Sequence, residues 1–406
     1  MGIYEDLGVT PIINLWGTAT RLGGSLMAPE VIEAMVHASR QSVKMDDLQA
    51  AASRIISEIT GAEAGYVTCG ASSGLTLGTA ACMTGLDIAK MDRLPDATDM
   101  PNEVVMPRDQ RCGYDHAIRA AGAKIVEVGY NEQNTGSLRP VEIWEFEAAL
   151  TERTAAIALI LYVYSDRTGN QLKEVAHMAR RHHVPVIVDA AGSVPPLENL
   201  RRFIRLGADL VTFSGGKALR GPQNTGILCG RHDLIAAAAL QHLDLGGFSH
   251  MWHPPESLIP KAKLIGQPRQ GIGRGQKVSK EALVGLLIRL RQLTKEKTLD
   301  EAKQMQQMLM RIIRAIEDIP SVQAELLHPA SEGSGSVPTL RVKLDAERLG
   351  RDAFEISLEL RNGRPGLWVN EKNLSDNIML ITAVNLNEQL ADTVGQRLRE
   401  VFTGEN

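Results

Sequence analysis

Short apolar runs alternate with amphipathic helical stretches over the middle of this 406-residue chain, and no other feature constrains the fold as strongly. The predicted strands are 65–68, 103–106, 124–128, 156–162, 184–189, 210–213 and 226–229. Helices are predicted between them, for example at 171–183 and 197–206. A chain with this alternation builds a mainly parallel sheet covered by helices on both faces. We therefore predict a three-layer α/β domain.

The pattern changes after residue 275. A helical region is predicted at 279–319, a loop at 329–336, strands at 339–344 and 378–382, and a closing helix that Asn387 would cap and that ends near residue 402. We expect three regions: an N-terminal arm or part of the small domain at 1–50, a large domain at 51–275, and a smaller α+β C-terminal domain at 276–406.

Charge and cysteine content limit the expected partners. The net charge is −4, whereas nucleic-acid binding needs a concentrated basic face, so we expect no nucleic-acid partner. The four cysteines are scattered without metal-ligand spacing, and we expect no metal. The sequence has no basic, apolar leader and no run of about 18 apolar residues. We expect a cytoplasmic protein without membrane contact.

Two charged residues follow successive predicted strands. Asp189 ends the apolar run 184–189, and Lys217 follows strand 210–213 within a Ser-Gly-Gly-Lys turn. Ligands of open α/β sheets bind outside the carboxyl ends of the strands, so both groups are expected at one sheet edge. An acid there can pair with a protonated pyridine nitrogen, and a lysine amine can attack a carbonyl. Alone, Asp189 is also compatible with a helix cap and Lys217 with a surface turn.

A third motif is the glycine-rich turn 68–74, which leads into a small-residue helix. Free backbone N–H groups at such a helix start bind phosphate. A plain tight turn gives the same pattern. The segment lacks the Gly-Lys-Ser/Thr of a P-loop and is no dinucleotide-binding motif.

In this order, the three motifs resemble the pyridoxal-phosphate (PLP)-dependent superfamily with the aspartate-aminotransferase fold (fold type I). The similarity is greatest to the group related to L-seryl-tRNA(Sec) selenium transferase, or selenocysteine synthase. The sequence segments that carry this similarity are 12–25, 70–74, 189–191, 213–217 with 221–226, and 274–281.

The resemblance implies roles for individual residues. Lys217 would form the Schiff base with PLP, and Asp189 would pair with the pyridine nitrogen. The residues implied around the phosphate and the ring are Gly70, Ala71, Ser72, Ser214 and Ala191. Gln223, Asn224 and Thr225 would reach the phosphate of a neighbouring subunit, so we expect a homodimer or a higher homo-oligomer.

The other ring face needs a flat side chain. Tyr114 and His116 are the candidates, and we favour His116, which we count with Lys217 and Asp189 as catalytic.

The substrate carboxylate requires an arginine, since guanidinium binds carboxylate in a bidentate manner. Arg274 and Arg364 are the preferred candidates, with Arg21 and Arg361 as alternatives. His250 and His253 form a His-x-x-His pair without a third metal ligand nearby.

The resemblance implies a PLP-dependent lyase. It would catalyse α,β-elimination with ammonia release from a small polar, hydroxylated or phosphorylated amino acid. A racemase or an aminotransferase on the same scaffold is the alternative, with Tyr114, His116 or Cys112 as the second acid/base of a racemase. Selenium transfer is less expected, because it needs seryl-tRNA as a substrate. A protein that only carries PLP without catalysis is also less expected.

Overall fold

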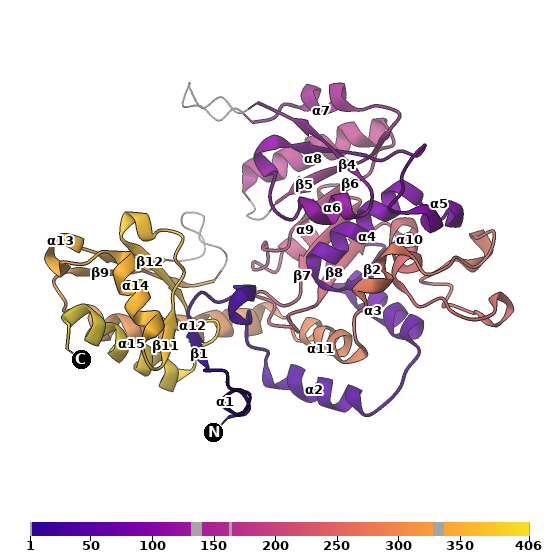
Figure 1. Cartoon of the computed structure of the whole chain (residues 1–406). Coiled ribbons are helices and arrows are strands. Elements are labelled where there is room, and N and C mark those ends of the chain that lie inside the picture. The colour runs from indigo at the N-terminus through magenta and orange to yellow at the C-terminus, as the bar shows by residue number, and fades with distance from the viewer. Residues whose placement is uncertain (1, 131–139, 162–164, 328–336, 406) are drawn as a thin grey trace. The chain divides into compact units, whose positions relative to one another are not determined.

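The structure is a computed structural model (Figure 1) that describes residues 2–130, 140–161, 165–327 and 337–405. The predicted loop 329–336 and the last residue of the predicted strand 156–162 lie outside these residues. The chain divides into two compact units. The large unit is Met27–Gln292, and the small unit combines Met1–Leu26 with Leu293–Asn406.

One seven-stranded sheet forms the large unit. Its strands, in order across the sheet, are β2 (Ala64–Thr68), β8 (Gly226–Gly230), β7 (Leu210–Ser214), β6 (Val186–Asp189), β5 (Thr154–Ile160), β3 (Glu103–Pro107) and β4 (Lys124–Val128). β8 runs antiparallel to both of its neighbours, and the pairs from β7 to β4 are parallel. The predicted mainly parallel sheet is confirmed.

Helices cover both faces of this sheet. α4 (Gly70–Thr84) contacts strands β5 to β8, and α10 (His232–His242) and α6 (Asp115–Ala120) pack beside it. Tyr66 of β2 joins the apolar core on this side, whereas a Cβ on the preceding Gly65 would meet Ile56 of α3 (Met45–Thr60). Alternate residues of a strand face opposite sides, so α4 and α3 lie on opposite faces. α8 (Asp166–Arg181) and α9 (Asn199–Arg205) contact β6 and β7.

The expected domain boundaries at 50 and 275 differ from the division that the structure shows. α2 (Pro29–Ser39) and α11 (Lys280–Arg291) pack on each other, and α11 also contacts α3. The Lys280 ammonium donates to the Ala38 carbonyl, 2.8 Å away. Both helices therefore belong to the large unit.

The small unit has an α+β architecture, as predicted. β1 (Ile12–Asn14) pairs in parallel with β11 (Gly366–Trp368), and an antiparallel sheet has the order β12-β10-β9. The elements around them are α12 (Lys295–Ile316), β9 (Val322–Leu327), β10 (Thr339–Leu344), α14 (Ala353–Asn362), β12 (Ile378–Thr382) and α15 (Glu388–Thr403). Asn387 caps α15 by accepting from the Leu390 N–H at 2.9 Å, as expected.

The predicted helical region 279–319 is two helices. α11 ends at Arg291, and Thr294 caps α12 by accepting from the Lys297 N–H at 3.1 Å. Apolar spacing does not show this break, because both helices bury an apolar face.

The remaining elements are short. They are α1 (Ile3–Asp6), η1 (Thr20–Leu22), α5 (Ile88–Arg93), η2 (Arg108–Gln110), α7 (Ile143–Ala149), η4 (Ser249–Met251), η5 (Lys261–Lys263), η6 (Ile272–Gln276), α13 (Ala346–Leu349) and η7 (Leu374–Asp376). Within the described ranges, no helix has the length and apolarity needed to cross a membrane. The same residues contain no group of three or more His, Cys, Asp or Glu side chains arranged to hold a metal.

Candidate active site

Three strands bring the predicted motifs to one edge of the large sheet. β6 and β7 are parallel, and β7 and β2 both run antiparallel to β8, so β2, β6 and β7 share one direction. Gly226 of β8 pairs with Thr68 at the end of β2 and with Ser214 at the end of β7. Asp189, the last residue of β6, pairs with Thr212. The glycine turn, Asp189 and the lysine turn therefore follow the same edge.

Asp189 is a buried carboxylate with a defined orientation. It is 6% exposed, and its Oδ1 accepts a hydrogen bond from the Ala191 N–H at 2.9 Å. Its Oδ2 accepts no hydrogen bond from a described residue, so this oxygen can take one from a ligand. Burial raises the pKa of Asp189, while the Ala191 N–H and the positive charge of Lys217 act in the opposite direction.

The turn that carries Lys217 is closed by close backbone contacts. The Gly215 N–H donates to the Thr225 carbonyl at 2.8 Å, and the Gly221 N–H donates to the Gly215 carbonyl at 2.9 Å. A Cβ on Gly216 would lie 2.4 Å from the Cα of Gln223, so no larger residue fits there without a shift. Lys217 itself is half-buried. Its backbone is therefore fixed while its side chain remains accessible.

The glycine turn before α4 forms a cradle for an anion. Gly70 adopts a φ of +78°, which favours glycine, and opens α4. Its carbonyl accepts from the Thr68 hydroxyl at 2.8 Å, and the Ala71 carbonyl accepts from Thr212 at 3.2 Å. The first N–H groups of a helix have no partner within the helix, and the helix dipole there attracts negative charge.

Ser73, in the first turn of α4, has a buried hydroxyl. It is 5% exposed, and its Oγ makes no hydrogen bond to a described residue. A buried hydroxyl without a partner is costly, and a bound phosphate oxygen would satisfy it. Together, the α4 start, Ser73 and the free oxygen of Asp189 fit the phosphate and the pyridine nitrogen of PLP.

The remaining predicted cofactor residues are distributed around this edge. Ser214 is half-buried at the end of β7. Thr225 is fully buried, and its hydroxyl donates to the Pro222 carbonyl at 2.6 Å in its own chain. A contact of Gln223, Asn224 or Thr225 with a neighbouring subunit stays a prediction.

The two candidates for stacking on the ring lie at the start of α6. Tyr114 is 57% exposed, and His116 is also exposed, with its Nδ1 3.1 Å from Nη2 of Arg119. α6 is anchored to α4, because the Thr76 hydroxyl donates to the Ala117 carbonyl at 2.9 Å. This contact places both candidates beside the helix that starts at the glycine turn, and the choice between them stays open.

Three of the four candidate arginines already have acidic partners. In the large unit, Arg274 forms an ion pair of 2.9 Å with Asp244. In the small unit, Arg21 and Arg361 both contact Glu371, and Arg21 lies 3.4 Å from it. Arg364 is exposed, and no ion pair joins it to a described residue. Arg364 is therefore the candidate whose charge is most available to a carboxylate.

Glu371 was not anticipated from the sequence. Besides the two arginines, its Oε1 accepts from the Ser357 hydroxyl at 2.7 Å. The Arg361 guanidinium also lies over the Trp368 ring, 4.3 Å from the ring centroid. Nothing in the local sequence marks Glu371, because Arg21 lies near the other end of the chain, and Ser357 and Arg361 belong to the preceding helix α14.

Comparisons with known proteins agree with this geometry. The family model described as aminotransferase class-V matches residues 114–332. The chain is 32% identical over 407 residues to a D-glucosaminate-6-phosphate ammonia lyase of Salmonella typhimurium, covering 98% of this chain and 97% of the relative. It is also 32% identical to a 5'-C-glycyluridine monooxygenase-decarboxylase of a Streptomyces species, covering 98% and 92%.

More distant sequences and a solved structure complete the comparison. An L-seryl-tRNA(Sec) selenium transferase of Mannheimia succiniciproducens is 25% identical and covers 83% of this chain and 71% of the relative. The structure of a D-glucosaminate-6-phosphate ammonia-lyase matches with a TM-score of 0.78 and 30% identity, covering 100% of this chain and 99% of that one. The predicted fold, PLP cofactor and PLP-dependent lyase class agree with these matches. The chain belongs to the aminotransferase class-V family of PLP-dependent enzymes.

Proposed function

We propose that this chain is an ammonia lyase that converts a small, polar, phosphorylated 2-amino acid into a 2-oxo acid. The observation that carries the proposal is the position of Asp189 and Lys217 at one sheet edge, next to the start of α4. The ammonia lyase that matches the chain over nearly its full length supports the reaction and a substrate of the D-glucosaminate 6-phosphate class.

PLP, when bound, supplies a conjugated ring that withdraws electrons from the carbon bearing the substrate amine. The first turn of α4 and Ser73 would bind its phosphate. Asp189 would stay ionised beside the pyridine nitrogen and hold a proton there. His116 or Tyr114 would cover one ring face, and Ala191 the other.

The Lys217 amine would act as the base and then as the acid. It takes the proton from the substrate Cα and returns a proton to the leaving β-hydroxyl, which departs as water. The released enamine tautomerises and takes up one water, giving the 2-oxo acid and ammonia. The net change is therefore loss of ammonia. We propose that Arg364 binds the substrate carboxylate.

The activity test is ammonia release by the purified, PLP-loaded chain. D-glucosaminate 6-phosphate, its unphosphorylated form, L-serine, D-serine and O-phosphoserine form the panel, and the Lys217→Ala variant is the control. We expect stoichiometric ammonia and 2-oxo acid from a phosphorylated member only. A product of inverted stereochemistry, or turnover that depends on an added 2-oxo acid, would favour the racemase or the aminotransferase instead.

A decarboxylase is a second candidate, because the monooxygenase-decarboxylase matches with the same identity as the ammonia lyase. It would release carbon dioxide and consume oxygen. Measuring ammonia, carbon dioxide and oxygen uptake in one reaction therefore separates the two candidates.

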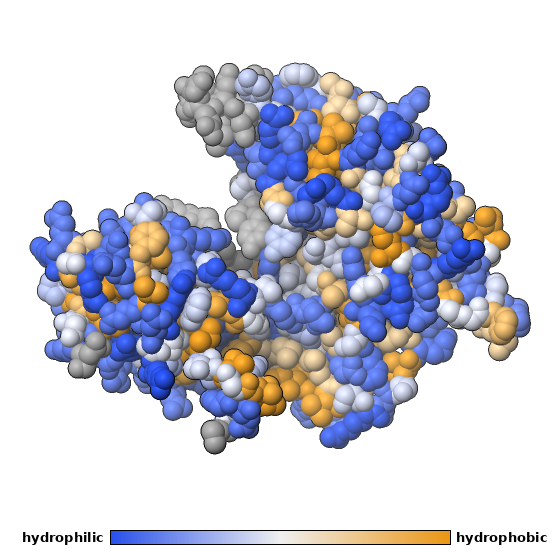
Figure 2. All heavy atoms as spheres, viewed as in Figure 1, coloured by the Kyte–Doolittle hydropathy of each residue, from blue (hydrophilic) through white to orange (hydrophobic). Residues whose placement is uncertain are grey.

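We also propose that the enzyme works as a homo-oligomer. The segment between α10 and α11 exposes large apolar side chains: Phe248 is 76% exposed, Met251 70% and Ile265 86%. Apolar side chains are visible on the surface of the large unit in Figure 2. Exposed apolar patches are typical of subunit interfaces. Light scattering coupled to size exclusion tests this, and a monomer at micromolar concentration would refute it.

We propose a cytoplasmic location. The four cysteines are all free thiols, and burial raises the pKa of Cys229 to about 12. Unpaired thiols are typical of reducing compartments. Fractionation of cells that express the chain would test this.

A further inference from the structure

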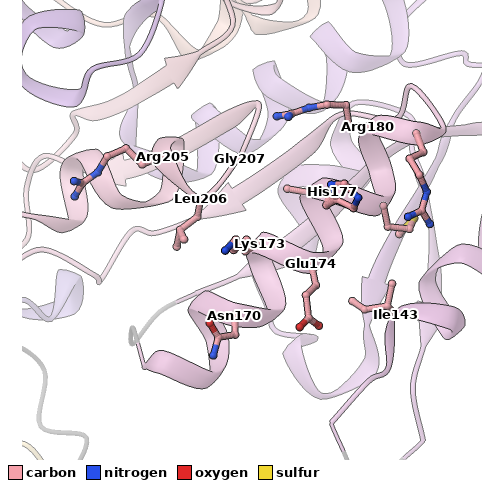
Figure 3. A pocket seen from close by; sticks show the side chains of 12 residues that line it. Ile143, Asn170, Lys173, Glu174, His177, Arg180, Arg205, Leu206 and Gly207 are labelled. Carbon is pink, nitrogen blue, oxygen red and sulfur yellow. The ribbon is translucent and has the colours of Figure 1, made fainter.

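A pocket of about 610 Å³ lies on the large unit among α7, α8 and the end of α9 (Figure 3). Its wall includes Leu206 and Gly207, which lead into the start of β7. Lys217 follows the other end of the same strand. This side of the pocket is therefore at the sheet edge opposite to the candidate active site, and none of the predicted site residues lines it.

The pocket is rich in positive charge. Lys173, Arg180 and Arg205 line it, and none of them forms an ion pair or a side-chain hydrogen bond with another described residue. Arg181 also lines it but is ion-paired with Glu147 at 2.9 Å. Glu174 is the acidic residue among the lining side chains. The wall therefore has more positive than negative charge.

Helix dipoles account for only part of this arrangement. Arg180 and Arg205 are in the last turns of α8 and α9, where the dipole favours cations. Lys173 is in the middle of α8, beyond the reach of that effect, and it shares a helix face with His177 and Arg180. The helix dipole therefore explains the positions of Arg180 and Arg205 but not that of Lys173.

We propose that this pocket binds a phosphorylated polyol, such as a sugar phosphate. Arg180 and Arg205 line the pocket from different helices, and Figure 3 shows Lys173 extending from α8 toward Leu206. These cations would bind the phosphate. Asn170 and Glu174, which lie along the same face of α8, offer amide and carboxylate groups to the hydroxyls. The volume is within the range of small-molecule pockets, about 300–1,000 Å³.

Calorimetry on the full, PLP-loaded chain at low salt tests the proposal. The probes are glucose 6-phosphate, inorganic phosphate and glucose. We expect saturable binding of glucose 6-phosphate, weaker binding of inorganic phosphate and none of glucose. The double variant Lys173→Gln, Arg205→Gln should bind glucose 6-phosphate at least about tenfold more weakly, because charge-assisted hydrogen bonds are lost. Lys90→Gln, which removes a cation from α5 that does not line the pocket, should bind as the wild type does.

A second measurement distinguishes this pocket from the PLP site. Hydrogen exchange should show protection of residues 170–181 and 205–207 when glucose 6-phosphate is added. Equal affinity in the double variant, or protection confined to the start of α4, would overturn the proposal. Equal affinity for inorganic phosphate and glucose 6-phosphate would overturn the proposal that the pocket recognises the hydroxyl groups of a polyol. The inference does not depend on the reaction proposed above, so ammonia release and this binding can fail separately.

Discussion

Gly226 lies so close to Gly70 that a Cβ added to Gly226 would be 2.3 Å from the carbonyl carbon of Gly70. The first residue of β8 thus supports the turn from which α4 starts. A methyl group there has no room, and the backbone of the turn would have to move.

Gly226→Ala should therefore weaken PLP binding. Overpacking costs about 1–3 kcal/mol, so we expect a dissociation constant raised by about five- to 150-fold. Titration of the apo-protein with PLP, followed by visible absorption, measures this. Gly266→Ala is the matched control, since its Cβ would have only an ordinary contact of 3.6 Å with Ile88. Equal affinities in the two variants would contradict the role assigned to Gly226.

Lys217→Ala should lower kcat by about 10²- to 10⁴-fold, the usual contribution of a positioned acid or base. Borohydride reduction of the wild type followed by peptide mapping should place the pyridoxyl label on Lys217. The variant should still bind PLP weakly through its phosphate. A label on another lysine would refute the assignment.

Asp189→Asn should stabilise the apo-protein at neutral pH. Burial raises the pKa of Asp189 above its unfolded value, so the folded state disfavours the charged form. The stability linked to this group is present below about pH 4, the ordinary value for aspartate, and is lost as the pH rises through the raised pKa. The variant should melt at a higher temperature than the wild type at pH 7, and the difference should shrink toward pH 4.

Asp99→Asn serves as the control for this experiment, because Asp99 is exposed and its φ of 61° is tolerated by asparagine. Its melting temperature should follow the wild type at every pH. With PLP bound, Asp189→Asn should melt at a lower temperature than the wild type, because the Asp189 carboxylate of the wild type then has a cationic partner. A variant that stays more stable in both forms would argue against an ion pair with the cofactor.

His116→Ala and Tyr114→Ala should differ in their effect on PLP. Aromatic stacking contributes about 0.5–1.5 kcal/mol, so loss of the stacking residue should raise the dissociation constant about two- to tenfold and shift the visible band. We expect this for His116→Ala. The same shift in Tyr114→Ala, with His116→Ala unchanged, would assign the stacking role to Tyr114.

Much of the large unit could be predicted from the sequence, because buried parallel strands are nearly continuous apolar runs. The proximity of Asp189 and Lys217 followed from the same logic, since each comes at the end of its strand. The antiparallel direction of β8 was not among the predictions, because an apolar run by itself does not indicate which way a strand runs. Its orientation depends on the tight turn at 215–225, which leaves no length for a helical crossover.

The acidic partners of the candidate arginines also could not be predicted from the sequence. Glu371 meets Arg21 only because β1 and β11 pair across most of the chain length. Asp244 and Arg274 form an ion pair although 30 residues separate them, and the segment between them has no regular periodicity of apolar residues. Side-chain partners of this kind are determined by tertiary packing, and the spacing of residues in the local sequence does not predict them.

The antiparallel course of β8 has one further consequence. Strands on both sides hold β7 and β8, the two stems of the hairpin that bears Lys217, so the backbone at the base of the hairpin has few alternative states. If the Lys217 amine condenses with the PLP aldehyde, as proposed, little backbone entropy would be lost in that step. The sheet has already restricted this freedom during folding.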